Sequence, residues 1–271
     1  PDFYPTNKSV KGDNQGMEYW SLMDSGNYNN NGYSPCAYTA WEREAMGWIA
    51  IPTLDVTDQP CEVDLKPIDD GGTAYRILND NDETDHEYLI IENIQQKGIN
   101  SRQRGHGMLM YHVNYEPYIF LYGNSVNNEA GSPRMTVVPA DNLLFAQYNV
   151  GKTIDGKVIK NADFYAQLAG DPFPGASNQT ECSDATGLVN FAPYIGESWN
   201  KAFQNIHEQN DGIITFTCQN IFSEGIKSVS TADIQENEFI YSVTGQRVGK
   251  GYKGVVICNG QKHLRIGKAV Y

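Results

Sequence analysis

The chain has 271 residues, of which 40% are hydrophobic and 11% aromatic, so a packed globular body is expected rather than a disordered chain. The formal net charge of −13 repels phosphate backbones and excludes a nucleic-acid partner. No apolar run approaches the roughly 18 residues that span a membrane, so we expect no transmembrane segment. Residue 1 is a proline with no signal segment before it, and we expect the chain to be the downstream part of a longer precursor.

The chain begins with loop and one helix. Residues 5–33 are rich in Asn, Gly, Ser and Asp and lack periodicity, which predicts an ordered loop. Ser34 is a good N-cap and Pro35 suits the first helical position, so a helix is predicted from there to Met46. Gly47 can supply the left-handed residue that ends it.

From Ile51 onward the pattern changes to short alternating segments separated by turn residues, which is typical of strands. Their density, without helical crossovers, favours antiparallel packing in a β-sandwich. Residues 162–205 are aperiodic and predict a long loop. The predicted strands are 61–68, 73–78, 86–93, 107–115, 135–139, 154–159 and 213–219.

The last fifty residues form a distinct segment. Residues 222–271 contain seven Lys or Arg and four Asp or Glu, which gives +3 against −16 for the rest, and such asymmetry marks a separate unit. Three short strands are predicted at 239–243, 254–258 and 263–266, with turns at 244–246 and at Asn259-Gly260. Either a small sheet of its own or a terminal hairpin that completes the main sheet fits this pattern.

Five cysteines are scattered without a C-x-x-C pair, which excludes a zinc ribbon or a thioredoxin-type motif. The odd number leaves at least one thiol free or paired with a segment outside this sequence. A bridge is allowed, but the sequence leaves its connectivity open.

The first 115 residues carry motifs that resemble the immune inhibitor A-like family of secreted bacterial zinc metallopeptidases (metzincin-like). Pro1-Asp2-Phe3-Tyr4 matches the end of the family's L-P-D-x-Y run, and Trp20-Ser21-Leu22-Met23 with Ser25-Gly26 matches its Met-turn. Residues 45–48 match the end of its post-turn helix. Residues 87–93 and 105–113 are similar to its strands E-Y-F-x-x-E-N and G-x-G-L-L-I-Y-H-V.

The resemblance implies a zinc site in the intact protein. In the family, two histidines of H-E-x-x-H bind zinc, and the glutamate between them acts as general base on the zinc-bound water. By position Asp2 is the candidate third zinc ligand, while Trp20 and Met23 belong to the Met-turn below the metal. The alternative for Asp2 is a terminal residue with no metal role.

The chain departs from the family in one decisive respect, because H-E-x-x-H does not occur in it. A lone aspartate does not hold catalytic zinc, which needs about three protein ligands, so no catalytic residue is expected here and the chain alone is predicted to be inactive. His106 and His112 are too far apart along one strand to share a metal, and we expect ordinary packing or surface roles.

A calcium site is the other metal candidate. Asp80, Asp82 and Asp85 form an acidic turn that could bind calcium, although it lacks the glycine and the distal glutamate of an EF-hand. A solvated hairpin tip is the alternative.

The tail is similar to short C-terminal modules of secreted Bacteroides-type proteins, of the form I-Y-x-x-x-G-x-R-V followed by K-G-x-x-I-x-N-G-x-K. Residues 240–248 and 253–262 carry this pattern. The resemblance implies sorting or attachment at the cell surface, and the basic charge of the tail would suit an anionic surface.

Together these observations predict an α+β, mainly β protein. Residues 1–52 would be the C-terminal part of a peptidase domain, 53–221 a β-sandwich and 222–271 a small β tail. The function expected from the resemblance is part of a secreted metalloendopeptidase that hydrolyses peptide or protein substrates. The alternative is a non-catalytic β-sandwich module for binding or adhesion at the bacterial cell surface.

Overall fold

The computed structural model describes residues 1–7, 9–10, 15–154, 156–221, 227–228, 240–242, 246–248, 254–258 and 261–265. The chain divides into two compact units, Pro1–Asn220 and Ile221–Tyr271. Within the described residues, no helix has the length and apolarity needed to cross a membrane.

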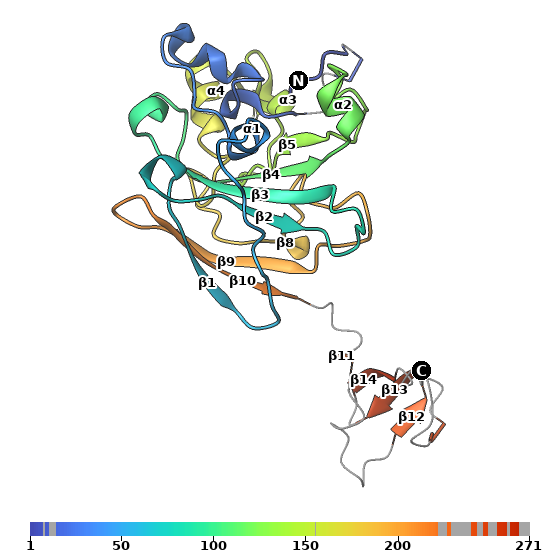
Figure 1. Ribbon diagram of the computed structural model, residues 1–271. Coiled ribbons are helices and arrows are strands. Elements are labelled where there is room, and N and C mark those ends of the chain that lie inside the picture. The colour runs from blue at the N-terminus through green and yellow to red at the C-terminus, as the bar shows by residue number, and fades with distance from the viewer. Residues whose placement is uncertain are drawn as a thin grey trace. The chain divides into compact units, whose positions relative to one another are not determined.

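The centre of the first unit is an antiparallel sheet of order β2-β3-β4-β5. Every residue of β3 is buried, because this sheet is covered on both faces (Figure 1). The strands are β2 (Tyr75–Leu78), β3 (Glu87–Ile94), β4 (Gly107–Asn114) and β5 (Met135–Val137).

A second antiparallel sheet, of order β1-β10-β9-β8, covers one face of the first. Apolar side chains of both sheets form one buried cluster, in which Leu65 and Phe216 join Leu89 and Met110. The strands are β1 (Cys61–Leu65), β8 (Cys182–Ser183), β9 (Lys201–Glu208) and β10 (Ile214–Asn220).

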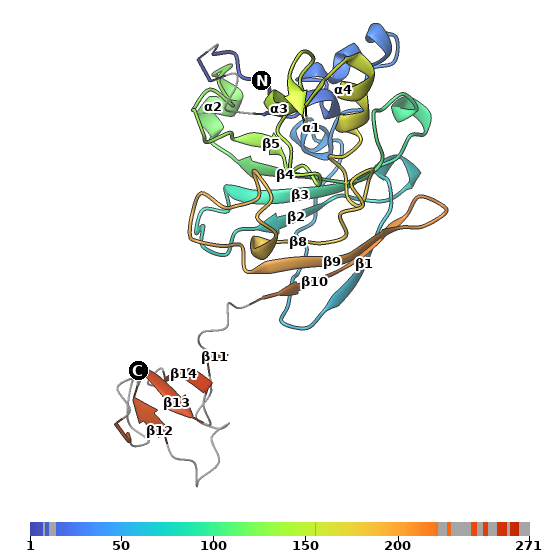
Figure 2. The ribbon, with the colours of Figure 1, turned by 180° about the vertical axis from the view of Figure 1, so that it is seen from behind.

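Helices and the N-terminal segment cover the other face, as both views of the ribbon show (Figures 1 and 2). A second buried cluster joins Phe3, Met17 and Trp20 to Ile90 and Tyr111 of this sheet. The helices are α1 (Ala40–Ala45), α2 (Pro117–Leu121), α3 (Phe145–Tyr148) and α4 (Asn161–Leu168). The 3₁₀ helices are η1 (Glu18–Trp20), η2 (Ser25–Gly32), η3 (Ile68–Asp70), η4 (Gly98–Asn100) and η5 (Asp184–Thr186).

The prediction of a β-rich α+β fold is confirmed, with three local errors. Helix α1 begins at Ala40 and not near Ser34, because Thr39 and Glu42 form a reciprocal capping box. Gly47 does take the left-handed conformation, with φ of +73°. The segment expected as one long loop contains α4 and most of β9, whose Phe203 and Ile206 point into the core.

A short hairpin stands where one strand was expected at 154–159. It consists of β6 (Thr153–Ile154) and β7 (Lys157–Val158), and Asp155 of its turn lies outside the described residues.

The second unit contains a sheet of order β11-β14-β13-β12. Its strands are β11 (Lys227–Ser228), β12 (Ile240–Ser242), β13 (Gly254–Cys258) and β14 (Gln261–Arg265). Strands β12, β13 and β14 pair antiparallel, and β11 adds a parallel edge. The three predicted tail strands are therefore confirmed, whereas most of the predicted 244–246 turn and all of Asn259-Gly260 lie outside the described residues.

Candidate functional site

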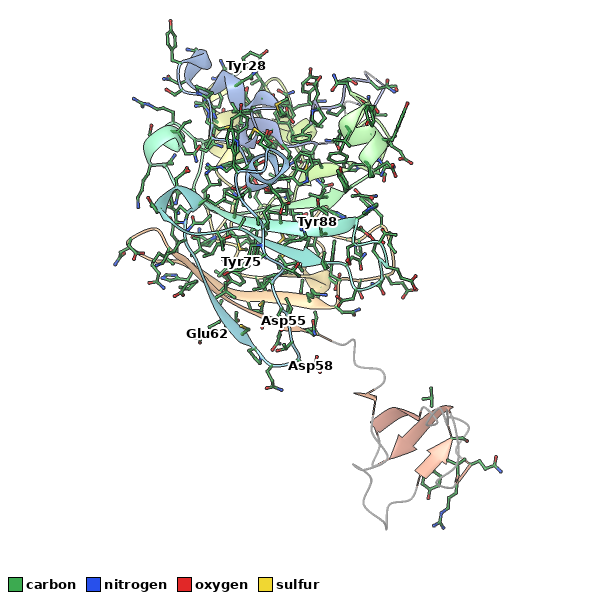
Figure 3. The ribbon with its side chains drawn as sticks, in the orientation of Figure 1. Tyr28, Asp55, Asp58, Glu62, Tyr75 and Tyr88 are labelled. Carbon is green, nitrogen blue, oxygen red and sulfur yellow. The ribbon has the colours of Figure 1, made fainter. Side chains whose placement is uncertain are left out.

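A cleft of about 490 Å³ brings together the two segments that carry the peptidase-like motifs. This volume lies within the range typical of ligand sites, about 300–1,000 Å³. Tyr28, which lines the cleft, and Glu62 of β1 mark opposite ends of the first unit in Figure 3. The described lining residues are Asp2, Tyr4, Pro5, Gln15, Glu18, Leu22, Met23, Asp24, Ser25, Asn27, Tyr28, Phe145 and Asn149.

Asp2 is held at the cleft by hydrogen bonds to its backbone and to its side chain. Its backbone N–H donates to Asn124 Oδ1 at 2.7 Å, and Tyr4 donates its hydroxyl to Asp2 Oδ2 at 2.9 Å. Asn124 Nδ2 also donates to Oδ2. No donor among the described residues contacts Oδ1, so one oxygen of this carboxylate is available for a ligand.

Phe3 joins this segment to the turn at Met23. Its N–H donates to the Met23 carbonyl at 2.8 Å, and its fully buried ring lies 5.5 Å from that of Trp41. Met23 is partly buried against the same core cluster. The segment that carries Asp2 is therefore anchored rather than loose, and it lies beside the Met-turn-like residues.

The turn at 21–26 is fixed by side chains from α1 and by one glycine. Ser21 Oγ donates to Glu42 Oε1 at 2.8 Å, while Gly26 N–H donates to the Ser21 carbonyl at 2.9 Å. A Cβ on Gly26 would lie 2.5 Å from that carbonyl oxygen and 2.3 Å from Cys36 Sγ. Only glycine fits at this position, which gives a physical reason for the S-G pair after Met23.

Asp24 lies at the floor of the cleft and orders the backbone before the turn. Its Oδ2 accepts from the N–H groups of Met17 at 2.9 Å and Glu18 at 2.8 Å. Burial raises the pKa of Asp24 to about 7 although these hydrogen bonds favour the charged form. Glu18 adopts φ of +50°, a conformation uncommon outside glycine.

Glu18 and Asp171 form a buried acidic pair near Trp20. Glu18 accepts from the Tyr148 hydroxyl at 2.7 Å, and Asp171 accepts from Trp20 Nε1 at 2.8 Å. Burial raises the pKa of both carboxyl groups well above the usual range, and for Glu18 the charge of Asp171 adds to this effect. Trp20 itself is buried and does not line this cleft.

The cleft is acidic, because Asp2, Glu18 and Asp24 line it while its described lining contains no Lys or Arg. Because burial raises the pKa of Glu18 and Asp24, these two carboxyl groups add less negative charge to the cleft near neutral pH than exposed carboxylates would. Among the described residues, no group of three or more His, Cys, Asp and Glu could hold a metal ion. The described residues therefore do not make up a zinc site by themselves, because Asp2 alone would give one ligand where about three are needed.

Two of the three aspartates of the predicted calcium turn have separate side-chain partners. Asp82 accepts from four donors, namely Thr84 N–H and hydroxyl and the N–H groups of His86 and Glu87, at 2.6–3.0 Å. Asp80 pairs with Lys201 Nζ at 2.5 Å, and Asp85 adopts φ of +56°. Asp80 and Asp82 thus order the turn between β2 and β3 through their side chains, and Asp85 through its backbone N–H, which donates to the Asp82 carbonyl at 3.2 Å.

The family-like strands supply a buried polar network that the sequence analysis missed. Glu87 Oε1 accepts from His112 Nε2 at 2.9 Å and from Tyr194 N–H at 2.5 Å. Oε2 accepts from Asn79 Nδ2 at 2.7 Å and Ile195 N–H at 2.9 Å. Burial alone would raise the pKa of Glu87, but these hydrogen bonds outweigh it and hold that pKa below its usual range.

His112 lies between two acceptors and is fully buried. Its Nδ1 is 3.0 Å from the Asn190 carbonyl, its Nε2 faces Glu87, and its ring stacks on Tyr194 at 4.7 Å. Each ring nitrogen therefore faces a hydrogen-bond acceptor. His112 is thus a packing residue, as expected, and it fastens the 190–195 segment to the central sheet.

Glu92 and Asn93 of the same motif connect β3 to both neighbouring layers. Glu92 Oε1 accepts from Ala40 N–H and the Tyr111 hydroxyl, each at 3.0 Å, and burial raises its pKa to about 7. Asn93 Nδ2 donates to the carbonyls of Leu65 at 2.7 Å and Gly212 at 2.8 Å. The motif therefore holds α1 on one face of the sheet and β1 on the other.

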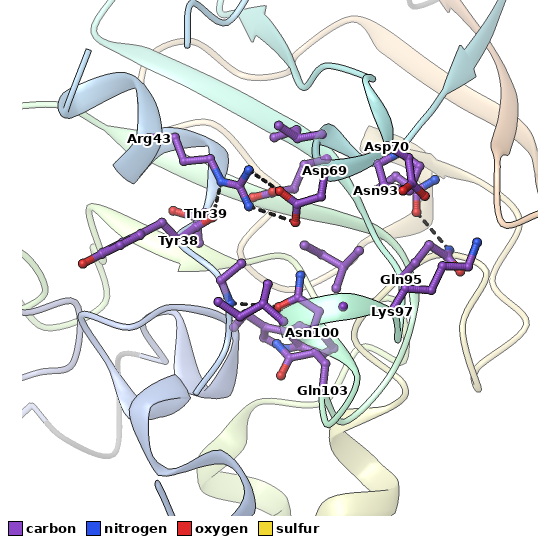
Figure 4. Close-up of a pocket in the computed structure, with 18 residues that line it drawn as sticks. Tyr38, Thr39, Arg43, Asp69, Asp70, Asn93, Gln95, Lys97, Asn100 and Gln103 are labelled. Carbon is purple, nitrogen blue, oxygen red and sulfur yellow. Dashed lines mark hydrogen bonds and ion pairs between the residues drawn. The ribbon is translucent and has the colours of Figure 1, made fainter. Parts of the chain in front are cut away.

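A second, smaller cavity of about 210 Å³ lies between α1, η3 and the 97–103 segment (Figure 4). Arg43 reaches across it to Asp69 with a bidentate ion pair at 2.7 and 3.2 Å. Its volume falls below the range of typical ligand sites, so the cleft at Asp2 and Met23 is the better candidate.

Comparison of the chain with models of protein families, with curated proteins and with solved structures finds no match. The candidate site therefore depends on the geometry above and on the motifs in the sequence.

Proposed function

We propose that this chain is part of a secreted zinc-dependent metalloendopeptidase and forms the floor of its active-site cleft. The observation that carries the proposal is the contact between two motif segments. Asp2 and Met23 line one acidic cleft, and the bond from Phe3 N–H to the Met23 carbonyl fixes their separation. An aspartate beside an apolar turn is the arrangement that the family resemblance implies for the third zinc ligand and the Met-turn.

The remaining zinc ligands must come from outside these 271 residues, because the sequence contains no H-E-x-x-H. Asp2 would contribute its free oxygen Oδ1, while Tyr4 and Asn124 orient the carboxylate through Oδ2. Such hydrogen bonds to the distal oxygen of a ligating carboxylate are typical of metal sites. Bound zinc would polarise a peptide carbonyl and activate water.

The test compares this chain with a longer form of the protein that includes the residues before Pro1. We expect about one zinc per molecule only in the longer form, and casein hydrolysis that a zinc chelator abolishes. Asp2→Ala should remove both zinc and activity. Asp70→Ala, a substitution in the separate smaller cavity, is the control and should retain both.

Two results would overturn the proposal: an upstream sequence without H-E-x-x-H, or casein hydrolysis that is unaffected by both the chelator and Asp2→Ala. Specific binding of a glycan or protein that does not depend on zinc would support the alternative, a non-catalytic adhesion module.

Two finer features complete the proposal. The shared core of sheets β2-β3-β4-β5 and β1-β10-β9-β8 supports their assignment as a β-sandwich behind the cleft. The four-stranded sheet of the second unit supports its assignment as a sorting or attachment module at the bacterial cell surface. Calcium at Asp80, Asp82 and Asp85 is not needed by the proposed function.

A further inference from the structure

Two cysteines lie directly opposite each other in the outer sheet. Cys61 is the first residue of β1, and its Cα partner in β10 is Cys218. Both carry free thiols in the structure. They are far apart in the sequence, so only the register of the two strands reveals the pair.

The two side chains point to the same face of this sheet. Side chains alternate along a strand, so Cys61 shares a face with Val63 and Leu65, and Cys218 shares one with Ile214 and Phe216. These four apolar residues are all buried in the core between the sheets. The thiols therefore lie side by side at the end of that core.

The spacing of such a pair suits a covalent bond. Directly opposed residues in antiparallel strands have Cα atoms about 4.5–5.5 Å apart. Disulfides join residues whose Cα atoms are about 4.4–6.8 Å apart. The spacing expected from the register of this pair therefore falls within the range that a disulfide joins.

We propose that Cys61 and Cys218 are a disulfide-forming site that cross-links β1 to β10 when a disulfide oxidant is supplied. The oxidant is a small-molecule disulfide or the exposed disulfide of an oxidoreductase, written R–S–S–R. The Cys61 thiolate attacks one of its sulfurs, which forms a mixed disulfide and releases the first R–SH. Cys218 then loses its proton and attacks Cys61 Sγ, which forms the Cys61–Cys218 bond and releases the second R–SH. Both thiol protons end on the two R–SH products, and the oxidant takes up the two electrons.

The order of attack follows from exposure. Cys61 is exposed to solvent, whereas Cys218 is fully buried, and burial raises the pKa of the Cys218 thiol to about 11. The accessible thiol therefore meets the oxidant, and the buried one completes the bond. Cys36 and Cys182 are also buried, and neither is the strand partner of another described cysteine.

The bond would act on an edge strand. β1 has β10 on one side only, and its cross-link would close a loop of roughly 150 residues, the case in which loop-closure entropy is largest. It would also fasten the edge of a sheet that is otherwise open to pairing with other chains.

The experiment uses the full 271-residue chain with glutathione as the probe. After incubation with oxidised glutathione, thiols are counted under denaturing conditions, and peptides are mapped by mass spectrometry without reduction. We expect the five thiols to fall to three, a single peptide that joins Cys61 to Cys218, and a midpoint of thermal unfolding that drops by roughly 5–15 °C on adding reductant.

Two variants make the result specific. Cys61→Ser, at an exposed position, should fold normally, lose no thiol pair and show no effect of reductant on unfolding. Cys61→Ser with Glu62→Cys moves the thiol by one residue to the opposite face of β1, and it should not bridge to Cys218. Oxidation that links other cysteines, leaves all five thiols free or links position 62 as readily would overturn the proposal.

Discussion

Replacing Glu87 with glutamine should strongly destabilise the first unit, because this fully buried carboxylate accepts four hydrogen bonds. Glutamine keeps one acceptor oxygen, and its amide NH₂ must face either the pair His112 and Tyr194 or the pair Asn79 and Ile195. At least two buried donors then lose their acceptor. Two donors left unsatisfied in this way cost about 3–5 kcal/mol together.

Urea denaturation followed by tryptophan fluorescence measures this loss, together with the midpoint of thermal unfolding. A cost of that size corresponds to a midpoint lowered by roughly 6–20 °C. Glu62→Gln, at an exposed position on β1, is the matched control and should change the free energy of unfolding by less than about 0.5 kcal/mol.

Asn79→Ala is a milder test of the same network, to be used if the Glu87 variant does not fold. It removes one of the four donors, and we expect a smaller loss of about 1–3 kcal/mol. Should Glu87→Gln stay within about 1 kcal/mol of the unmodified chain, the network would be solvated in solution and its assigned role would be refuted.

Three further predictions concern buried carboxyl groups and the 21–26 turn. Burial raises the pKa of Asp24 and Glu92 to about 7. Their contribution to the free energy of unfolding is therefore complete below the pKa of about 4 in the unfolded chain, and it is lost as pH rises to about 7. Asp24→Asn and Glu92→Gln should flatten this decline, which urea titrations between pH 4.5 and 8 would measure. Glu87 has the opposite sign, since its lowered pKa gives stability that is present above about pH 4.5 and is lost on further acidification; an unfolding curve insensitive to pH between 2 and 4.5 would contradict this. Gly26→Ala should destabilise the 21–26 turn by about 1–3 kcal/mol, because its Cβ would overlap the Ser21 carbonyl. The Cβ of Gly47→Ala meets no atom within 4 Å, so this variant should cost only its left-handed backbone strain of about 1 kcal/mol. Thermal unfolding compares the two variants, and equal effects would exclude the overlap as the cause.

The strands in which apolar and polar residues alternate clearly were predictable from the sequence. The order of the strands within each sheet was not. β9 escaped prediction because its inward residues are interrupted by polar ones. Lys201 begins that strand and is itself buried, since it pairs with Asp80 from a distant turn. Because lysines are mostly exposed, a lysine in the sequence favours the prediction of a loop unless its buried partner is known.

The helix start shows a different kind of error. Ser34-Pro35 and Thr39-x-x-Glu42 are both helix-start signals, and the second one forms. Glu42 also accepts from Ser21, so the helix begins where its cap can fasten the neighbouring turn. The contact of Glu42 with the 21–26 turn therefore favours the second helix-start signal over the first.

The candidate site was only partly visible in the sequence. Asp2 and Met23 were predictable because they belong to spaced motifs. Glu18 and Asp171 are far apart in the sequence, so their pairing could not be predicted from it. Glu87 and His112 are diagonal neighbours on one face of β3 and β4, which follows only from the register that places Glu87 opposite Asn114. Pairs of this kind become apparent once the sheet is assembled.

The burial of β3 on both faces has a consequence for how this protein can be rearranged. A strand covered on one side by the 1–52 segment and on the other by the outer sheet cannot lose either cover without exposing a row of large apolar side chains. Gene fusion or exchange within the first unit would therefore leave both products with half a core. The cleft and its two supporting sheets would therefore have to be inherited together, as the whole unit Pro1–Asn220.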